Sequence, residues 1–210
     1  MTEGRRHSGG RPTAKAAIQM EATILEQATA AFLANGYAAT TIEAIARRCG
    51  VAKRTIYARW DGKPALFRAA LERLLTRWLA VATDWTAAGT LEAALLAAAE
   101  QMLSVALTPE AVALHRLLVA ESGRFPELPA MIRQAGGAEG IIRIAELLDR
   151  SVAGGQLPPQ NTVYAAEQFM HLVLAGPQRR ALGLAPALTP EEISAWAAEA
   201  VSLFLRGATR

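Results

Sequence analysis

Apolar residues recur every three or four positions along most of the chain, which is the spacing of one face of an α-helix. Glycine and proline clusters separate these stretches, and the alternating pattern of a convincing β-strand does not occur. The pattern predicts nine helices. The seventh is a long helix that ends near residue 153 and has a candidate break at Gly136-Gly137. The others have approximate ranges of 16–35, 41–49, 53–60, 64–87, 91–107, 109–123, 161–182 and 189–205.

The composition agrees with an all-α fold. Hydrophobic residues make up 52% of the chain, and alanine and leucine, which are strong helix formers, dominate them. Aromatic residues make up only 6%. A chain of 210 residues can bury a sizeable core and fits one or two domains.

Residues 40–67 have the pattern of two short helices joined by a tight turn. Thr40 followed by Glu43 predicts a capping box, and Gly50 ends the first helix because glycine accepts left-handed backbone at little cost. A small residue, Ala46, stands where the two helices would cross. This is a helix-turn-helix layout, and its second helix has the cations and small polar residues that suit the major groove of DNA.

Charge is distributed unevenly along the chain. Residues 1–70 hold 11 Lys and Arg against 5 Asp and Glu, whereas residues 71–210 hold 11 against 14. The first part therefore carries +6 and the second −3, within a total of +3. A basic N-terminal third joined to a slightly acidic remainder indicates a binder of polyanions with a separate body.

Other classes of protein lack support in the sequence. Cys49 is the only cysteine, which excludes an intramolecular disulfide and gives no metal cluster, so we expect it to be a small buried hydrophobe. We find no glycine-rich phosphate loop, nucleophile elbow or set of histidines and acids for a metal, and therefore expect neither an enzyme nor a cofactor. Without a signal segment or a run of about 18 apolar residues, we expect a cytoplasmic protein that does not bind membranes.

A longer set of residues surrounds the helix-turn-helix pattern. It consists of Asn35-Gly36-Tyr37, Thr40-Thr41, Ile45-Ala46, Gly50-Val51, Thr55-Ile56-Tyr57, and Lys63 with Ala65-Leu66-Phe67. In this order and spacing, over about fifty residues, the chain resembles the tetracycline-repressor (TetR) family of DNA-binding regulators. Two positions depart from the family pattern: Trp60 replaces a usual phenylalanine, and Arg54 replaces a residue that is commonly small. Arg54 makes the expected groove-facing surface more cationic.

The segment from His115 to Leu184 resembles the AefR-like type of C-terminal domain in this family, through VAESGRFPELP and the later loop GGQLPPQ. The two resemblances together imply three parts. These are a disordered basic arm at 1–15, a three-helix DNA-binding domain at 16–62, and a helical-bundle ligand-binding and dimerisation domain at 63–210. In the arm, Gly10-Arg11-Pro12 is either a minor-groove contact or part of a solvated tail.

The family geometry assigns roles around the second helix of the motif. Lys53, Arg54, Thr55 and Ala58 are expected to face base edges, whereas Thr40, Thr41, Tyr57, Arg59 and Lys63 are expected to contact phosphates. A solvated surface is the alternative for the charged residues. Arg47 and Arg48 could also face phosphate, or pair with a nearby acid.

The resemblance also implies a homodimer and a small-molecule effector. We expect the last two helices to form the dimer interface through Leu172, Val173, Gly176, Trp196, Ala200, Val201 and Phe204, with ordinary packing inside one chain as the alternative. Candidate ligand-binding residues are Trp78, Met102, Leu103, His115, Leu118, Phe169 and Met170, each of which could instead belong to the core.

These expectations describe a regulator that binds a palindromic DNA operator and is released by an apolar or amphipathic ligand. The alternative is a DNA-binding regulator without a small-molecule gate, controlled by a protein partner.

Overall fold

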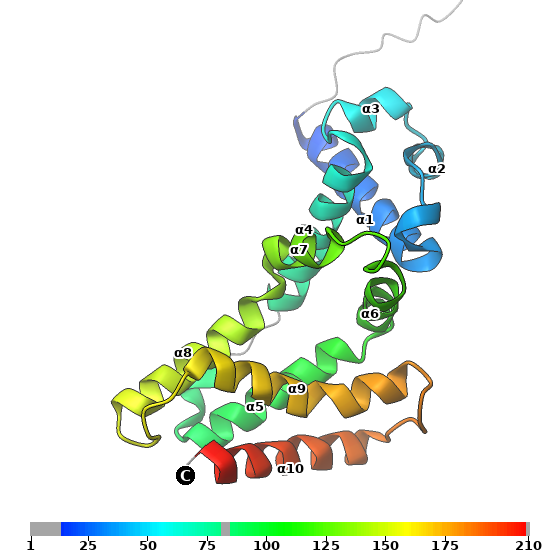
Figure 1. The fold of residues 1–210 in the computed structure, drawn as a ribbon. Helices are drawn as coiled ribbons and strands as arrows, with labels where there is room; N and C mark the ends of the chain where they lie inside the picture. Colours follow the sequence, from blue (N-terminus) through cyan, green and yellow to red (C-terminus); the bar gives the residue numbers. More distant parts are fainter. Residues whose placement is uncertain (1–13, 81–84, 209–210) are drawn as a thin grey trace, which may run out of the picture.

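A computed structural model describes residues 14–80 and 85–208 of the chain (Figure 1). Within these residues it contains ten α-helices and no strand, which confirms the all-α prediction. Figure 1 shows an elongated molecule with α1 to α3 at one end and α9 and α10 side by side at the other. The helices between these ends, α4, α6 and α7, join the two parts.

The first part, called the head below, consists of α1 (Ala14–Ala39), α2 (Ile42–Cys49), α3 (Lys53–Tyr57) and the beginning of α4 (Gly62–Ala80). Gly50 ends α2 in the left-handed conformation, with φ 65°, as its position in the sequence predicts.

The residue that caps α2 was predicted wrongly. Thr41, and not Thr40, is the N-cap, and its side-chain oxygen accepts the Ala44 N–H at 3.2 Å. Thr40 is only 2% exposed and donates its hydroxyl to the carbonyls of Ala31 and Gly36, at 3.1 and 2.7 Å. The Thr40 hydroxyl therefore bonds carbonyls at the end of α1, and its neighbour Thr41 takes the N-cap position of α2.

The end of α1 also differs from the prediction. Gly36 does interrupt the helical backbone, with φ 82° and ψ 169°, but helical hydrogen bonding resumes beyond it as far as Ala39. The result is a kinked helix instead of a helix that stops at residue 35. This kink leaves backbone N–H groups in the middle of the head without helical partners.

The second part, called the body below, contains the remaining helices. They are α5 (Leu91–Ala106), α6 (Pro109–Glu121), α7 (Leu128–Ile132), α8 (Glu139–Ala153), α9 (Thr162–Ala181) and α10 (Pro190–Ala208). The side chains of Thr90 and Thr108 cap α5 and α6 as predicted.

Three helices are shorter than predicted. α3 ends at Tyr57 and not at residue 60, and α4 ends at Ala80, with a short 3₁₀ turn, η1, at Trp85–Ala88. A π-helical turn, η2 (Arg133–Gly137), divides the predicted seventh helix into α7 and α8. This break at the two glycines accounts for ten helices where nine were expected.

Buried side chains form two clusters. The first joins α1 to α4 with Leu114 and Leu117 of α6 and with Leu128 of α7, so both helices pack into the core of the head. Its centre is aromatic, since the Phe32 and Phe67 rings lie 4.8 Å apart. The second cluster joins η1, α5, α8, α9 and α10.

Among the described residues, no single helix is long and apolar enough to cross a membrane. Only α5 and α6 taken together have that length and composition, and they are bent by 76°.

Candidate DNA-binding surface and ligand cavity

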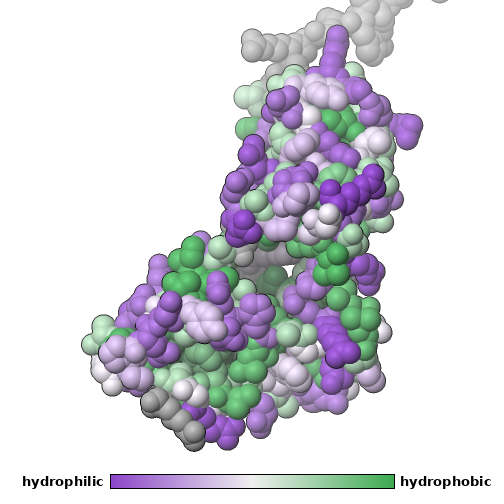
Figure 2. All heavy atoms as spheres, viewed as in Figure 1, coloured by the Kyte–Doolittle hydropathy of each residue, from purple (hydrophilic) through white to green (hydrophobic). Residues whose placement is uncertain are grey.

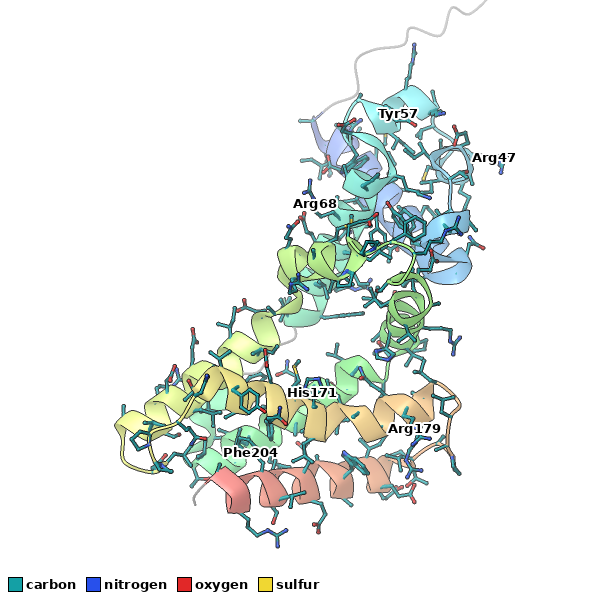
Figure 3. All side chains as sticks on the ribbon, in the orientation of Figure 1. Arg47, Tyr57, Arg68, His171, Arg179 and Phe204 are labelled. Atoms are coloured by element: carbon teal, nitrogen blue, oxygen red, sulfur yellow. The ribbon has the colours of Figure 1, made fainter. Side chains whose placement is uncertain are left out.

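The surface of α3 is held in place by one buried residue. Ile56 is fully buried in the core of the head, which directs the opposite side of this short helix outward. Figure 3 shows Tyr57 and Arg47 at the end of the head that lies far from α10. Of the residues predicted to contact DNA, the exposed ones are Thr41, Lys53, Arg54, Tyr57, Ala58 and Arg59, and Thr55 is half-buried.

Lys53 is paired with an acid across the turn. Its ammonium forms an ion pair with Glu43 of α2 and lies 5.4 Å from the centre of the Tyr57 ring. The hydrogen bond with Lys53 lowers the pKa of Glu43, and the same bond raises the pKa of Lys53. Glu43 therefore competes with any phosphate or base for this cation.

The arginines of this surface differ in what they contact. Arg59 lies close to α1, with its Nε 3.8 Å from a carboxylate oxygen of Glu21, and Arg48 donates to the side-chain oxygen of Gln27 at 3.2 Å. Arg54 is exposed and forms no ion pair or side-chain hydrogen bond with the rest of the described chain. Of the three, Arg54 is therefore the most available to DNA.

Two residues predicted to bind phosphate have other partners. The hydroxyl of Thr40 is buried and bonded as described above, so its side chain is not available to phosphate and that prediction is wrong. The ammonium of Lys63 donates to the carbonyls of Tyr37 and Ala38, at 2.9 and 3.2 Å, and lies 4.6 Å from the centre of the Tyr37 ring. An ammonium has three N–H donors, so Lys63 keeps one for a phosphate while it holds the end of α1.

A contact that was not predicted joins the body to the head. Glu121, the last residue of α6, accepts the N–H groups of Tyr37 at 2.6 Å and of Ala38 at 2.8 Å. These donors follow the kink at Gly36, where the helix begins anew and presents free N–H groups that attract a carboxylate. We call this contact the Glu121 clamp.

Neighbouring side chains reinforce the clamp. Phe125 packs edge-to-face on Tyr37, with ring centres 5.0 Å apart. Burial raises the pKa of Tyr37, and the Glu127 and Glu121 carboxylates add to this shift. One feature of the sequence could have indicated the clamp: an acid at the C-terminal end of a helix is disfavoured by the helix dipole, so Glu121 needs a partner elsewhere.

A cavity of about 310 Å³ lies where α4 to α9 meet. Figure 2 shows hydrophobic residues around a hollow between the head and the lower helices. Five of the predicted ligand-binding residues line the cavity: Trp78, Met102, His115, Leu118 and Met170. Leu103 and Phe169 do not, because both are fully buried in the second core cluster, and their prediction as ligand contacts is wrong.

The polar lining of the cavity was not predicted, apart from His115. Its other polar members are Gln101, Arg143 and Gln178, and none of the lining residues in the described chain is an aspartate or glutamate. Trp85 also lines the cavity and donates its indole N–H to Gln101 at 2.7 Å. The remaining lining is apolar, so the cavity suits a ligand with an apolar body and few polar groups.

Most of the predicted dimer residues pack inside one protomer. Val173, Ala200 and Val201 are at most 5% exposed in the second core cluster, so the structure contradicts their prediction as interface residues. The Trp196 ring lies directly on Gly176, where an added Cβ would overlap it, and its indole N–H donates to the Val173 carbonyl at 3.0 Å. These contacts join α9 to α10 within the chain. Leu172 and Phe204 are half-buried.

The described residues hold no group of three or more histidines, cysteines and acids that could bind a metal. Cys49 is half-buried rather than buried, and desolvation raises the pKa of its thiol. Neither observation adds a catalytic or metal site to the DNA-binding surface and the cavity.

Comparisons with known proteins cover both parts of the chain. Residues 24–70 match the bacterial regulatory proteins of the tetR family, and residues 93–207 match the C-terminal domain of AefR-like transcriptional repressors. No curated protein sequence gives a significant match.

Solved structures give the same result. The flavonoid-responsive regulator FrrA is 32% identical, with 90% of this chain and 96% of that chain covered and a TM-score of 0.75. A putative TetR-family regulator from Mesorhizobium loti MAFF303099 is 23% identical, with 91% and 97% covered and a TM-score of 0.78. The regulator FadR from Bacillus subtilis, solved with stearoyl-CoA, is 16% identical, with 89% and 98% covered and a TM-score of 0.69. The chain belongs to the TetR family of DNA-binding transcription regulators, which are not enzymes.

Proposed function

We propose that this protein is a repressor that binds a palindromic operator as a homodimer and is released when an apolar or amphipathic small molecule enters the cavity. It would act in the cytoplasm. The observation that carries the proposal is the position of α6. This helix lines the cavity through Leu114, His115 and Leu118, and its last residue, Glu121, holds the head.

The clamp gives a ligand a means of moving the head. A ligand that displaces the cavity-lining part of α6 must also displace the Glu121 carboxylate, because both belong to the same helix. Its two hydrogen bonds, at 2.6 and 2.8 Å, weaken steeply when stretched or bent. The head must therefore follow α6 or lose the clamp. In either case the spacing of the two heads changes from the 34–36 Å that successive major grooves require.

α4 offers a second connection of the same kind. Leu75 and Trp78 line the cavity, and Leu66 and Phe67 of the same helix lie in the core of the head. A ligand that touches both α4 and α6 acts on the head from two sides. Since coupling between sites is reciprocal, operator DNA should weaken ligand binding by the factor by which ligand weakens operator binding.

On the DNA side, we assign base readout to Arg54 and phosphate contacts to Thr41 and Tyr57. Arg54 is exposed and without an ion pair among the described residues, which favours a bidentate contact with guanine. Lys53 would also contact the DNA once it breaks its ion pair with Glu43. Arg11 of the N-terminal arm, a candidate for the minor groove, lies outside the described residues.

For the dimer, we propose the outward face of α9 and α10. His171, Ala175 and Arg179 follow one another at helical spacing along the exposed side of α9, and Leu203 on α10 is 55% exposed. Leu172, Trp196 and Phe204 would lie at the border of this surface. A two-fold contact through this face would make the operator palindromic.

The solved relatives support a small-molecule gate. FrrA is described as flavonoid-responsive, and FadR of Bacillus subtilis was solved with stearoyl-CoA. Control by a protein partner is the second candidate, but the cavity beside α6 favours a small molecule.

The first test is selection of bound sequences from random DNA duplexes with the full-length protein at near-physiological salt. We expect a palindromic site. Binding that depends on salt but not on sequence would contradict the proposal.

A further inference from the structure

Two of the polar residues that line the cavity, Gln101 and Arg143, hold other groups of the protein. Gln101 accepts the indole N–H of Trp85, and the guanidinium of Arg143 lies 4.2 Å from the centre of the Trp85 ring. Both residues also have further interactions within the protein. Since they already support the wall of the cavity, we assign no ligand contact to them.

The other two polar residues of the lining, His115 and Gln178, are free to meet a ligand. Within the part of the chain that the structure describes, neither side chain forms a hydrogen bond or an ion pair. Both residues are half-buried, and no buried side-chain nitrogen or oxygen among the described residues lacks a hydrogen-bond partner. The unbonded polar atoms of these two residues are therefore accessible and not sealed in the core. An amide and a neutral imidazole each offer a donor and an acceptor, which suits hydroxyl and carbonyl groups.

The two free residues belong to different walls of the cavity. His115 lies on α6, whose Leu114 packs in the first core cluster, and Gln178 lies on α9, whose Phe169 packs in the second. The apolar lining divides in the same way, with Leu75, Trp78, Leu118 and Ile132 beside the first cluster and Met102 and Leu174 beside the second. The cavity thus lies between the two clusters. A ligand that bonds to both free residues connects one cluster to the other.

The apolar lining favours an aromatic ligand. Trp78 contributes an indole ring, and Met102 and Met170 contribute thioethers, which pack well on aromatic groups. The cavity volume of about 310 Å³ is near the lower end of the range for ligand pockets. Such a volume suits a compact molecule of a few rings.

We infer that the effector is a compact aromatic molecule with two or more hydroxyl or carbonyl groups, one bonded to His115 and another to Gln178. This inference rests on the proposed function, because it names the ligand class of the proposed gate. Such a ligand ties α6, which carries the Glu121 clamp, to α9 in the second core cluster. Hydroxyl groups should therefore strengthen binding. In a cavity without free partners, each hydroxyl would weaken binding instead, because it would be buried without a hydrogen bond.

Biphenyl and its dihydroxy derivatives test the inference, because they share one ring system. The diols are the 2,2′, 3,3′ and 4,4′ isomers, whose hydroxyl groups lie at different separations. Equilibrium dialysis measures the affinity of the full-length protein for each probe. The wild type should bind the best of the diols about fivefold or more tighter than biphenyl, which corresponds to one net hydrogen bond.

His115→Phe and Gln178→Met remove the polar groups and keep most of the side-chain volume. Each variant should show a smaller preference for the diol, and the double variant should prefer biphenyl. Gln168→Met is the matched control, since Gln168 is an exposed glutamine of α9 that does not line the cavity. It should leave the preference unchanged. Binding of biphenyl by each variant shows that the cavity is intact.

Three results would overturn the inference. The first is a wild type that binds biphenyl as tightly as every diol, or more tightly. The second is a diol preference that survives in the double variant, because other groups would then form the hydrogen bonds. The third is the absence of saturable binding for all probes, because a compact aromatic ring system would then not enter the cavity.

The two proposals fail separately. Release of the operator by biphenyl, without any preference for a diol, would leave the gate and remove the hydrogen-bonding class. A diol preference that depends on His115 and Gln178, in a protein whose operator binding no probe alters, would leave the binding site and remove the gate.

Discussion

The Glu121 carboxylate occupies the space in which any residue other than glycine at position 36 would place its side chain. A Cβ on Gly36 would overlap the nearer carboxylate oxygen, and the backbone there has a φ of 82°, which L side chains rarely adopt. The same glycine thus creates the kink that frees two N–H groups and makes room for the acid that accepts them. Body and head are joined at this point by complementary features 85 positions apart in the chain.

Glu121→Gln should destabilise the protein. An amide presents one acceptor and one donor, so one of the two backbone N–H groups loses its partner, at a cost of about 1–3 kcal/mol. Urea unfolding measures the loss. Glu110→Gln, at the other end of the same helix, removes an exposed ion pair with Arg77 and should cost at most about 1 kcal/mol. Equal losses for the two variants would show that the clamp is no stronger than a surface pair.

Gly36→Ala tests the shape of the clamp. We expect a larger loss than for Gly183→Ala, because Gly183 has nearly the same φ, 84°, but no atom near an added Cβ. Gly183→Ala should lower the free energy of unfolding only by the cost of left-handed backbone, about 1–2 kcal/mol. The difference between the two midpoints of urea unfolding measures the overlap with Glu121. No difference would mean that the carboxylate moves aside freely.

Gly176→Ala should destabilise the contact of α9 with α10. Replacing a helical glycine by alanine normally stabilises a helix by about 1 kcal/mol, but here the methyl group overlaps the Trp196 ring. Gly140→Ala is the control, since its Cβ would make only an ordinary contact with Met170 at 3.9 Å. In thermal unfolding, Gly140→Ala should have a higher melting temperature than the wild type, and Gly176→Ala a lower one. A gain for Gly176→Ala would mean that the ring is not held against α9.

Arg54→Ala should relax sequence preference at one base pair of each half-site. Loss of a bidentate contact with guanine costs about 1–3 kcal/mol at that position. Tyr57→Phe should instead weaken binding to all sequences alike, because it removes a contact with phosphate. Sequence selection with each variant separates the two effects. An unchanged site for Arg54→Ala would remove Arg54 from base readout.

Glu43→Gln should strengthen DNA binding at low salt. The substitution releases Lys53 from its ion pair, so one more cation is free to meet the phosphates. The slope of log affinity against log salt should steepen by about one. Low pH should act in the same direction, because the pKa of Glu43 is lowered and its charge is lost only as the pH falls through that value. A slope that matches the wild type would show that DNA displaces Glu43 without cost.

The sequence was sufficient to predict the helices and the helix-turn-helix motif, because the residues that determine them act locally. Gly50 and the caps Thr90 and Thr108 each act within a few residues of themselves. Thr40 and Thr41 show the limit of this reasoning. Both residues suit a cap, and only the carbonyls that α1 leaves open decide which of them is buried.

Partners distant in the chain could not be predicted. Leu103 and Phe169 lie on apolar helix faces like those of Met102 and Met170, and helical periodicity does not distinguish a core from a cavity wall. Periodicity likewise does not distinguish a residue of the core, such as Val173, from one at a subunit interface. The backbone partners of Glu121 lie 83 and 84 positions away in the chain, beyond the reach of any local sequence pattern.

The most direct test of the connection between body and head is operator affinity. The wild type, Glu121→Gln and Glu110→Gln are compared on a full palindrome and on a duplex with a single half-site. We predict that Glu121→Gln binds the half-site as the wild type does but binds the palindrome about tenfold more weakly, because each head keeps its reading surface and loses its fixed orientation. Wild-type affinity of Glu121→Gln for the palindrome would contradict the account.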